Sequence, residues 1–169
     1  MEKLWSPWRT QYIESFKDKK GDEPCIFCEA GSSKIEDDNA LVVHKGDSCF
    51  VMLNKYPYNS GHLMVIPYRH ISDFLEMNNE EMIESLKLSQ FSMKILNKLM
   101  KPHGFNVGLN LGKAAGAGIH QHIHLHIIPR WTGDTNFMPV IGEVKTISQD
   151  LLVTKRNIIK ILPDIKTDN

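Results

Sequence analysis

Four histidines occupy every second position of one segment in the second half of the chain. They are His120, His122, His124 and His126. Alternate side chains of an extended strand point to the same face, so this spacing predicts a row of imidazoles opposite Ile123, Leu125 and Ile127 in the core. Buried imidazoles need partners for their nitrogens, so a row of them indicates chemistry rather than packing. Imidazole is both a common ligand for transition metals and a nucleophile near neutral pH.

A glycine-rich loop at residues 112–118 directly precedes these histidines. Its small residues expose backbone N–H groups, which can hold an anion such as phosphate. A loop of this composition also serves as a flexible connector, and that alternative stays open. A phosphate-binding loop next to nucleophilic histidines would favour phosphoryl or nucleotidyl transfer as the reaction. If the chain bends after the loop, His120 leaves the row, and we expect it to be peripheral or on the phosphate side.

Short apolar runs separated by turns predict an antiparallel meander and further strands around this row, and apolar residues spaced by about 3.6 residues or its multiples predict a long helix. The expected strands span residues 40–44, 49–53, 62–66, 105–110 and 119–128, and a C-terminal helix lies within 146–162. The long helix begins at Asn78 or Asn79, with Glu81 nearby, and ends at residues 101–104. Its predicted apolar face comprises Met82, Leu86, Met93, Leu96 and Met100.

The composition excludes several classes of protein. The chain has 169 residues, 41% of them hydrophobic, as expected of one globular domain. Lys and Arg number 20 and Asp and Glu number 20, so no net field attracts nucleic acid or an anionic membrane. The N-terminal residues lack the apolar region of a signal peptide, and no apolar run reaches the roughly 18 residues of a membrane span. We therefore expect a cytoplasmic protein that binds neither nucleic acid nor membrane.

Two of the three cysteines form the pair Cys25-x-x-Cys28. Three cysteines do not make a disulfide framework, and in a reducing compartment such a pair more often binds metal or does redox chemistry. A tetrahedral zinc site would need two further ligands from elsewhere in the fold. Cys49, inside an expected strand, is predicted to be a small core residue.

The segment His122-Ile123-His124-Leu125-His126-Ile127-Ile128 resembles the signature of the histidine-triad (HIT) superfamily, His-x-His-x-His-x-x with apolar residues at each x. Residues 53–67 resemble the N-terminal half of that family. Residues 129–138 and 4–9 look most similar to the branch that contains diadenosine tetraphosphate phosphorylases and related hydrolases. The resemblance covers residues 25–138 of a single domain, leaving an N-terminal arm at 1–24 and a tail with a helix at 139–169.

The resemblance implies an α+β fold of the HIT type, usually a homodimer, in which an antiparallel sheet carries the triad and an adenine nucleotide binds. His124 would attack the α-phosphate to form a nucleotidyl-histidine, and His126 would hold the phosphate or the leaving group. The catalytic set is then His122, His124 and His126. The nucleotide-binding set is Asn54, His62, Asn110, Gly116, Gly118, Ile119 and Trp131, with the backbone N–H groups of 116–119 stabilising developing charge. For Asn54 and Asn110 turn formation is the alternative.

Several members of the superfamily, and the related galactose-1-phosphate uridylyltransferases, complete a Cys-x-x-Cys zinc site with two histidines. The resemblance therefore implies a metal set of Cys25, Cys28, His70 and His122. Zn²⁺ would act structurally there, because protein side chains fill all four positions.

Together these features predict a nucleotide hydrolase or nucleotidyltransferase that cleaves a phosphoanhydride of an adenine nucleotide such as diadenosine tetraphosphate. Water as the acceptor makes it a hydrolase, and phosphate makes it a phosphorylase. Three alternatives stay open. One is an enzyme that cleaves a phosphoramidate or adenylyl sulfate, another is a non-catalytic nucleotide-binding zinc protein, and the third is a protein that handles nickel or copper.

Overall fold

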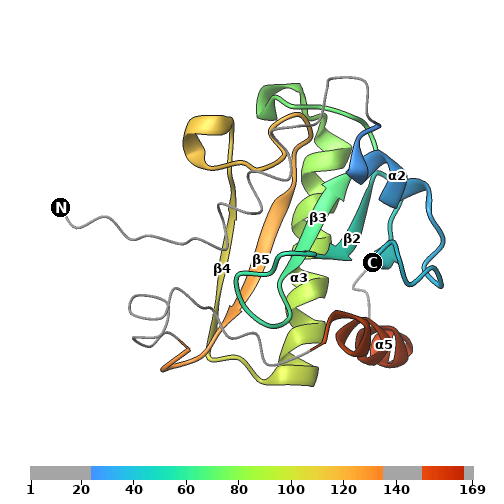
Figure 1. Cartoon of the computed structure of the whole chain (residues 1–169), viewed down its shortest axis with the longest axis vertical. Helices are drawn as coiled ribbons and strands as arrows, with labels where there is room; N and C mark the ends of the chain where they lie inside the picture. The colour runs from blue at the N-terminus through green and yellow to red at the C-terminus, as the bar shows by residue number, and fades with distance from the viewer. Residues whose placement is uncertain (1–23, 135–149, 166–169) are drawn as a thin grey trace.

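The computed structural model describes residues 24–134 and 150–165 and has a five-stranded sheet with helices packed against it (Figure 1). The strands are β1 (Val42–Lys45), β2 (Cys49–Leu53), β3 (Leu63–Pro67), β4 (Gly104–Leu109) and β5 (Leu125–Arg130). The helices are α2 (Ile26–Ser32), α3 (Asn79–Met100) and α5 (Leu151–Ile161), and the 3₁₀ turns are η1 (Phe74–Glu76), η2 (Lys113–Ala115) and η3 (Leu162–Asp164). The predicted α+β fold is confirmed. Most of the predicted arm, the end of the predicted core at 138 and part of the tail lie outside the described residues.

The sheet runs in the order β1-β2-β3-β5-β4, and every neighbouring pair is antiparallel. β2 and β3 pair along their whole lengths and are buried throughout, so they form the centre of the sheet. β5 joins this centre through Met64 of β3, which lies opposite His126. The predicted meander of the first three strands is confirmed. β5 lies between β3 and β4 in the sheet.

β5 begins at Leu125, so the predicted strand over 119–128 is wrong in its first half. The backbone N–H of Ile123 donates to the carbonyl of Ile71 (2.8 Å), which satisfies this amide outside the sheet. Of the four histidines in the predicted row, His122, His124 and His126 are buried. His120 is only half-buried, so the buried row contains three histidines rather than four.

The apolar residues between the histidines are buried as predicted, but in two clusters. Leu125 and Ile127 belong to the main core, whereas Ile123 packs with Ile71 and Met77 in a smaller cluster. The change of cluster coincides with the start of β5. The triad therefore straddles the junction between an irregular segment and a strand.

α3 begins and ends where the sequence predicts. The side chain of Asn78 accepts the Glu81 N–H (2.8 Å) while the Glu81 carboxylate accepts the Asn78 N–H (3.0 Å), forming a capping box. Lys101 ends the helix in the left-handed region, and its N–H donates to the Asn97 carbonyl. The Glu81 carboxylate also accepts two hydrogen bonds from Arg69, at 2.9 and 2.8 Å. This ion pair ties the start of α3 to the segment that follows β3.

The predicted apolar face of α3 is partly wrong. Leu86 is 64% exposed, and serines take part in the buried face instead. These serines are Ser85, Ser89 and Ser92, whose hydroxyls donate to the carbonyls of Met82, Ser85 and Leu88. A serine that bonds within its own helix is small and leaves no unpaired polar group, so it is tolerated against the sheet. Apolar periodicity alone cannot detect such a face.

α5 follows Asp150, whose carboxylate accepts the N–H groups of Leu152 and Val153 (2.9 Å each) and caps the helix. Ile158 belongs to the main core, and α5 contacts β1 and α3. The predicted C-terminal helix is confirmed within the described residues. Over these residues we find no helix with the length and apolar content needed to cross a bilayer.

Candidate functional site

The four predicted metal ligands come together beside α2 and the end of β3. They are Cys25, Cys28, His70 and His122, and their ligand atoms all lie within 4.8 Å of one another. Three sulfur–nitrogen distances are 3.3, 3.4 and 3.6 Å. Tetrahedral zinc with ordinary Zn–S and Zn–N bonds separates sulfur from nitrogen by about 3.6 Å. The cluster therefore has the dimensions of a tetrahedral metal site.

The protonation pattern of the cluster also fits a cation. The Nε2 atom of His122 lies 2.9 Å from the Pro67 carbonyl oxygen, so Nε2 carries the proton and donates. The lone pair on Nδ1 then faces the sulfurs of Cys25 and Cys28. Burial and the neighbouring Cys25 raise the pKa of the Cys28 thiol, and a bound cation would reverse this penalty on the thiolate.

His124 has one nitrogen anchored and the other set for chemistry. Its Nδ1 lies 2.9 Å from the backbone oxygen of His122, so Nδ1–H donates and Nε2 carries the lone pair. Burial lowers the pKa of His124, which keeps the ring neutral near pH 7. A neutral imidazole with a lone pair on one nitrogen is the form that attacks phosphorus.

Hydrogen bonds also set the tautomer of His126. The backbone N–H of Tyr58 donates to Nδ1 of His62 (3.1 Å), so the proton of His62 sits on Nε2, which lies 2.9 Å from Nδ1 of His126. His62 therefore donates to His126, whose own proton is placed on Nε2. The Tyr58 ring stacks on His62 at a centroid distance of 5.0 Å. These contacts make Nδ1 of His126 the acceptor and Nε2 its protonated nitrogen.

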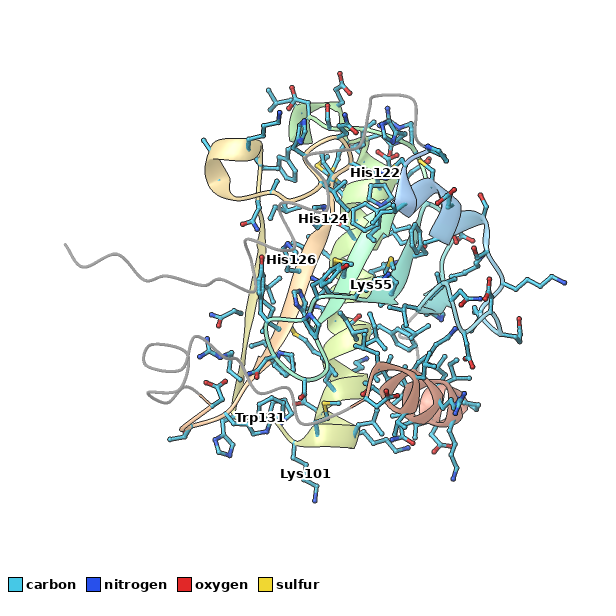
Figure 2. The ribbon with its side chains drawn as sticks, viewed as in Figure 1. Lys55, Lys101, His122, His124, His126 and Trp131 are labelled. Carbon is cyan, nitrogen blue, oxygen red and sulfur yellow. The ribbon has the colours of Figure 1, made fainter. Side chains whose placement is uncertain are left out.

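Figure 2 shows the triad histidines along one line, while Trp131 lies at the far end of β5. The Trp131 indole N–H donates to the Met100 carbonyl (3.3 Å). Asn54 takes the turn role, because its side-chain oxygen accepts the Tyr56 N–H (2.9 Å). His62 is 0% exposed and lies beneath His126, with both of its ring nitrogens close to protein groups. Direct contacts of these residues with a nucleotide stay predictions.

The glycine-rich loop contains a turn, η2, rather than an open connector. The N–H of Gly116 donates to Lys113 (3.0 Å) and that of Ala117 donates to Gly112 (3.3 Å). Gly112 and Gly116 have φ values of 76° and 85°, where a side chain would be strained. Two of the amides expected to bind phosphate are thus used within the turn. The other predicted members of the set in and beside this loop are Asn110, Gly118 and Ile119.

Sequence reasoning missed two residues that contact the triad, Phe27 and Tyr58. The Phe27 ring lies 5.0 Å from the ring of His124 and 5.6 Å from that of His122, measured between centroids. The position of Phe27 inside the Cys-x-x-Cys pair was the available signal. Tyr58 acts partly through its backbone N–H, which no residue type reveals.

Comparison with known proteins gives a family and named relatives. Residues 36–133 match the family described as HIT domain. The chain is 38% identical over 161 residues to a Mycobacterium tuberculosis protein named AP-4-A phosphorylase, with 92% of this chain and 82% of that protein covered. It is 35% identical over 126 residues to an uncharacterized HIT-like protein of Methanocaldococcus jannaschii, with 75% and 93% covered.

Solved structures share the fold. A Zn-bound histidine triad family protein from Mycobacterium smegmatis has a TM-score of 0.65 at 24% identity, covering 83% of this chain and 94% of that one. At this level of identity the likeness concerns the architecture.

Proposed function

The chain belongs to the HIT domain family, and on this premise we propose that it cleaves a phosphoanhydride of an adenine nucleotide through a nucleotidyl-histidine. A dinucleoside polyphosphate such as diadenosine tetraphosphate is the proposed substrate. The single observation that carries the proposal is the anchoring of His124, whose Nδ1–H bond to His122 leaves the Nε2 lone pair for attack. The relative named AP-4-A phosphorylase supports the choice of substrate.

In the proposed reaction His124 is the nucleophile and His126 is the proton donor. Nε2 of His124 forms a bond to the α-phosphorus, and the bond from that phosphorus to the bridging oxygen breaks. With diadenosine tetraphosphate the adenylyl group stays on His124 and ATP leaves. In this mechanism Nε2 of His126 donates its proton to the phosphate or the departing oxygen. Phosphate then attacks the adenylyl group to release ADP, or water attacks to release AMP, and the phosphorus–nitrogen bond breaks.

The test is the variant His124→Ala, assayed on diadenosine tetraphosphate with and without phosphate. Loss of the nucleophile is expected to lower turnover by about 1,000-fold or more while nucleotide binding is kept. The control is His44→Gln. His44 lies on the edge strand β1, which β2 and β3 separate from β5 in the sheet. Unchanged turnover in His124→Ala would reject the mechanism. A panel that adds phosphoramidates and adenylyl sulfate identifies the substrate class.

We also propose that Zn²⁺ is the resident metal of the Cys25, Cys28, His70 and His122 cluster. Bound zinc would neutralise the two thiolates and fasten α2 to the segment before β5. Elemental analysis of the purified protein is expected to find about one zinc per chain, lost in the double variant Cys25→Ser, Cys28→Ser. Cys49→Ala is the control, because the buried Cys49, whose pKa burial raises to about 12, lies outside the cluster. Protein that holds no zinc at neutral pH would contradict this proposal.

A further inference from the structure

Phe27 links the metal cluster to the histidine that the proposed reaction uses. It lies on α2 between Cys25 and Cys28 and is 2% exposed. Its ring meets the edge of His122 almost perpendicularly, at an interplanar angle of 88°, and packs obliquely on His124 at 46°. One side chain therefore contacts a metal-cluster histidine and the anchored histidine at once.

The imidazole of His124 is held on three sides. The His122 carbonyl takes Nδ1–H, the Phe27 ring lies 5.0 Å away, and the His126 ring lies 4.8 Å away at 81°. A single hydrogen bond restrains one atom of the ring but lets the plane swing about it. The two flanking rings restrict that rotation, because side chains in a packed interior have few free rotamers.

We propose that Phe27 is a positioning residue that aims Nε2 of His124 at the phosphorus. This inference rests on the proposed function, because it assigns a task to a neighbour of the proposed nucleophile. A small displacement of a reacting group lowers the reaction rate by a large factor. A buried ring that fixes the orientation of His124 therefore affects kcat. Phe27 is 2% exposed and packs on His124, so the role proposed for it is exerted through that ring.

The two cysteines on either side of Phe27 hold the short helix α2 in place. A helix of seven residues is marginally stable by itself. Its N-cap is Cys25, which makes no side-chain capping bond, and Cys28 lies in its first turn. The two thiols on either side of Phe27 therefore tie the backbone that carries this ring to His70 and His122.

The first experiment compares Phe27→Leu with Phe91→Leu. Phe91 is a matched control, because it is buried and its ring also packs on a histidine, His44, at 4.7 Å. Both variants are expected to lower Tm, since each loses a buried ring. Phe27→Leu alone is expected to lower kcat on diadenosine tetraphosphate, by about 10- to 100-fold, with KM changed by less than about twofold. An unchanged kcat in Phe27→Leu, or an equal loss in both variants, would overturn the proposal.

Zinc content separates positioning from damage to the metal cluster. Phe27→Leu is expected to keep the same zinc per chain as the wild type, and loss of zinc together with kcat would overturn the proposal. If the leucine variant does not fold, Phe27→Met takes its place, because methionine keeps apolar volume without a flat ring.

Side-chain nitrogen NMR of the histidines tests the inference without substrate. His124 is expected to show one Nδ1–H tautomer in the wild type and in Phe91→Leu, and an averaged signal in Phe27→Leu. A wild type that turns over no nucleotide but shows this contrast would overturn the proposed function and the catalytic part of this proposal, while showing that Phe27 holds the His124 ring. An unaveraged signal in Phe27→Leu would overturn that role while leaving the His124→Ala result intact.

Discussion

At the scale of single residues, each triad imidazole has one nitrogen directed to a protein partner. Pro67 takes the Nε2–H of His122, and the carbonyl of His122 takes the Nδ1–H of His124. His62 donates to Nδ1 of His126. Because a neutral imidazole has one donor and one acceptor, each contact decides whether the opposite nitrogen can take its proposed role as metal ligand, nucleophile or proton donor.

The donor role of His126 predicts the effect of changing His62. Without the His62 N–H, Nδ1 of His126 can take up the ring proton and Nε2 loses it. His62→Leu is expected to lower kcat by about 10- to 100-fold. His62→Gln, whose amide can donate to Nδ1, should recover part of the loss. Steady-state kinetics on diadenosine tetraphosphate measures both variants, and a leucine variant with wild-type kcat would contradict the assigned tautomers.

At the scale of elements, α5 is tied to the loop between α2 and β1 by two basic side chains of different burial. Lys155 is 1% exposed, and its ammonium donates to the Asp37 carbonyl (2.6 Å). Arg156 makes an exposed ion pair with Asp38 (2.9 Å). Lys155→Met is expected to lower the free energy of unfolding by about 1 kcal/mol, because it removes a charged donor from a partly buried carbonyl. Arg156→Met should change it by less than about 0.5 kcal/mol, since solvent screens that pair. Denaturant titration compares the two, and equal losses would contradict the argument.

At the scale of the whole molecule, the proposed homodimer has a candidate surface in β4. Among the described residues β4 pairs only with β5, and its sequence Gly104–Leu109 carries no charge or proline to block another strand. Val107, in the middle of this edge, is 45% exposed. We expect light scattering to find a dimer that Val107→Lys shifts towards monomer. Leu86→Lys, which adds the same charge on the exposed side of α3, should not, and a wild-type monomer would contradict the dimer.

Residue types and spacing were enough to predict the features that depend on neighbours in the chain. Short apolar runs bounded by turns predicted β2 and β3, and Asn78 with Glu81 predicted the start of α3, because strand pattern and capping act over a few residues. The histidine spacing predicted a row of four imidazoles, of which His122, His124 and His126 are buried. It could not show that the strand starts only at Leu125, since the bond from Ile123 to Ile71 joins segments far apart in the chain.

Long-range packing determines which of the candidate residues meet and which nitrogen of each triad histidine carries the proton. It brought Cys25 to His122 across 97 positions, set His62 beneath His126, and placed Phe27 against His124. It also placed Trp131 at the other end of β5 from the triad. Contacts of this kind follow from how the helices and strands pack, and a local pattern of residue types carries no information about a partner so distant in the chain.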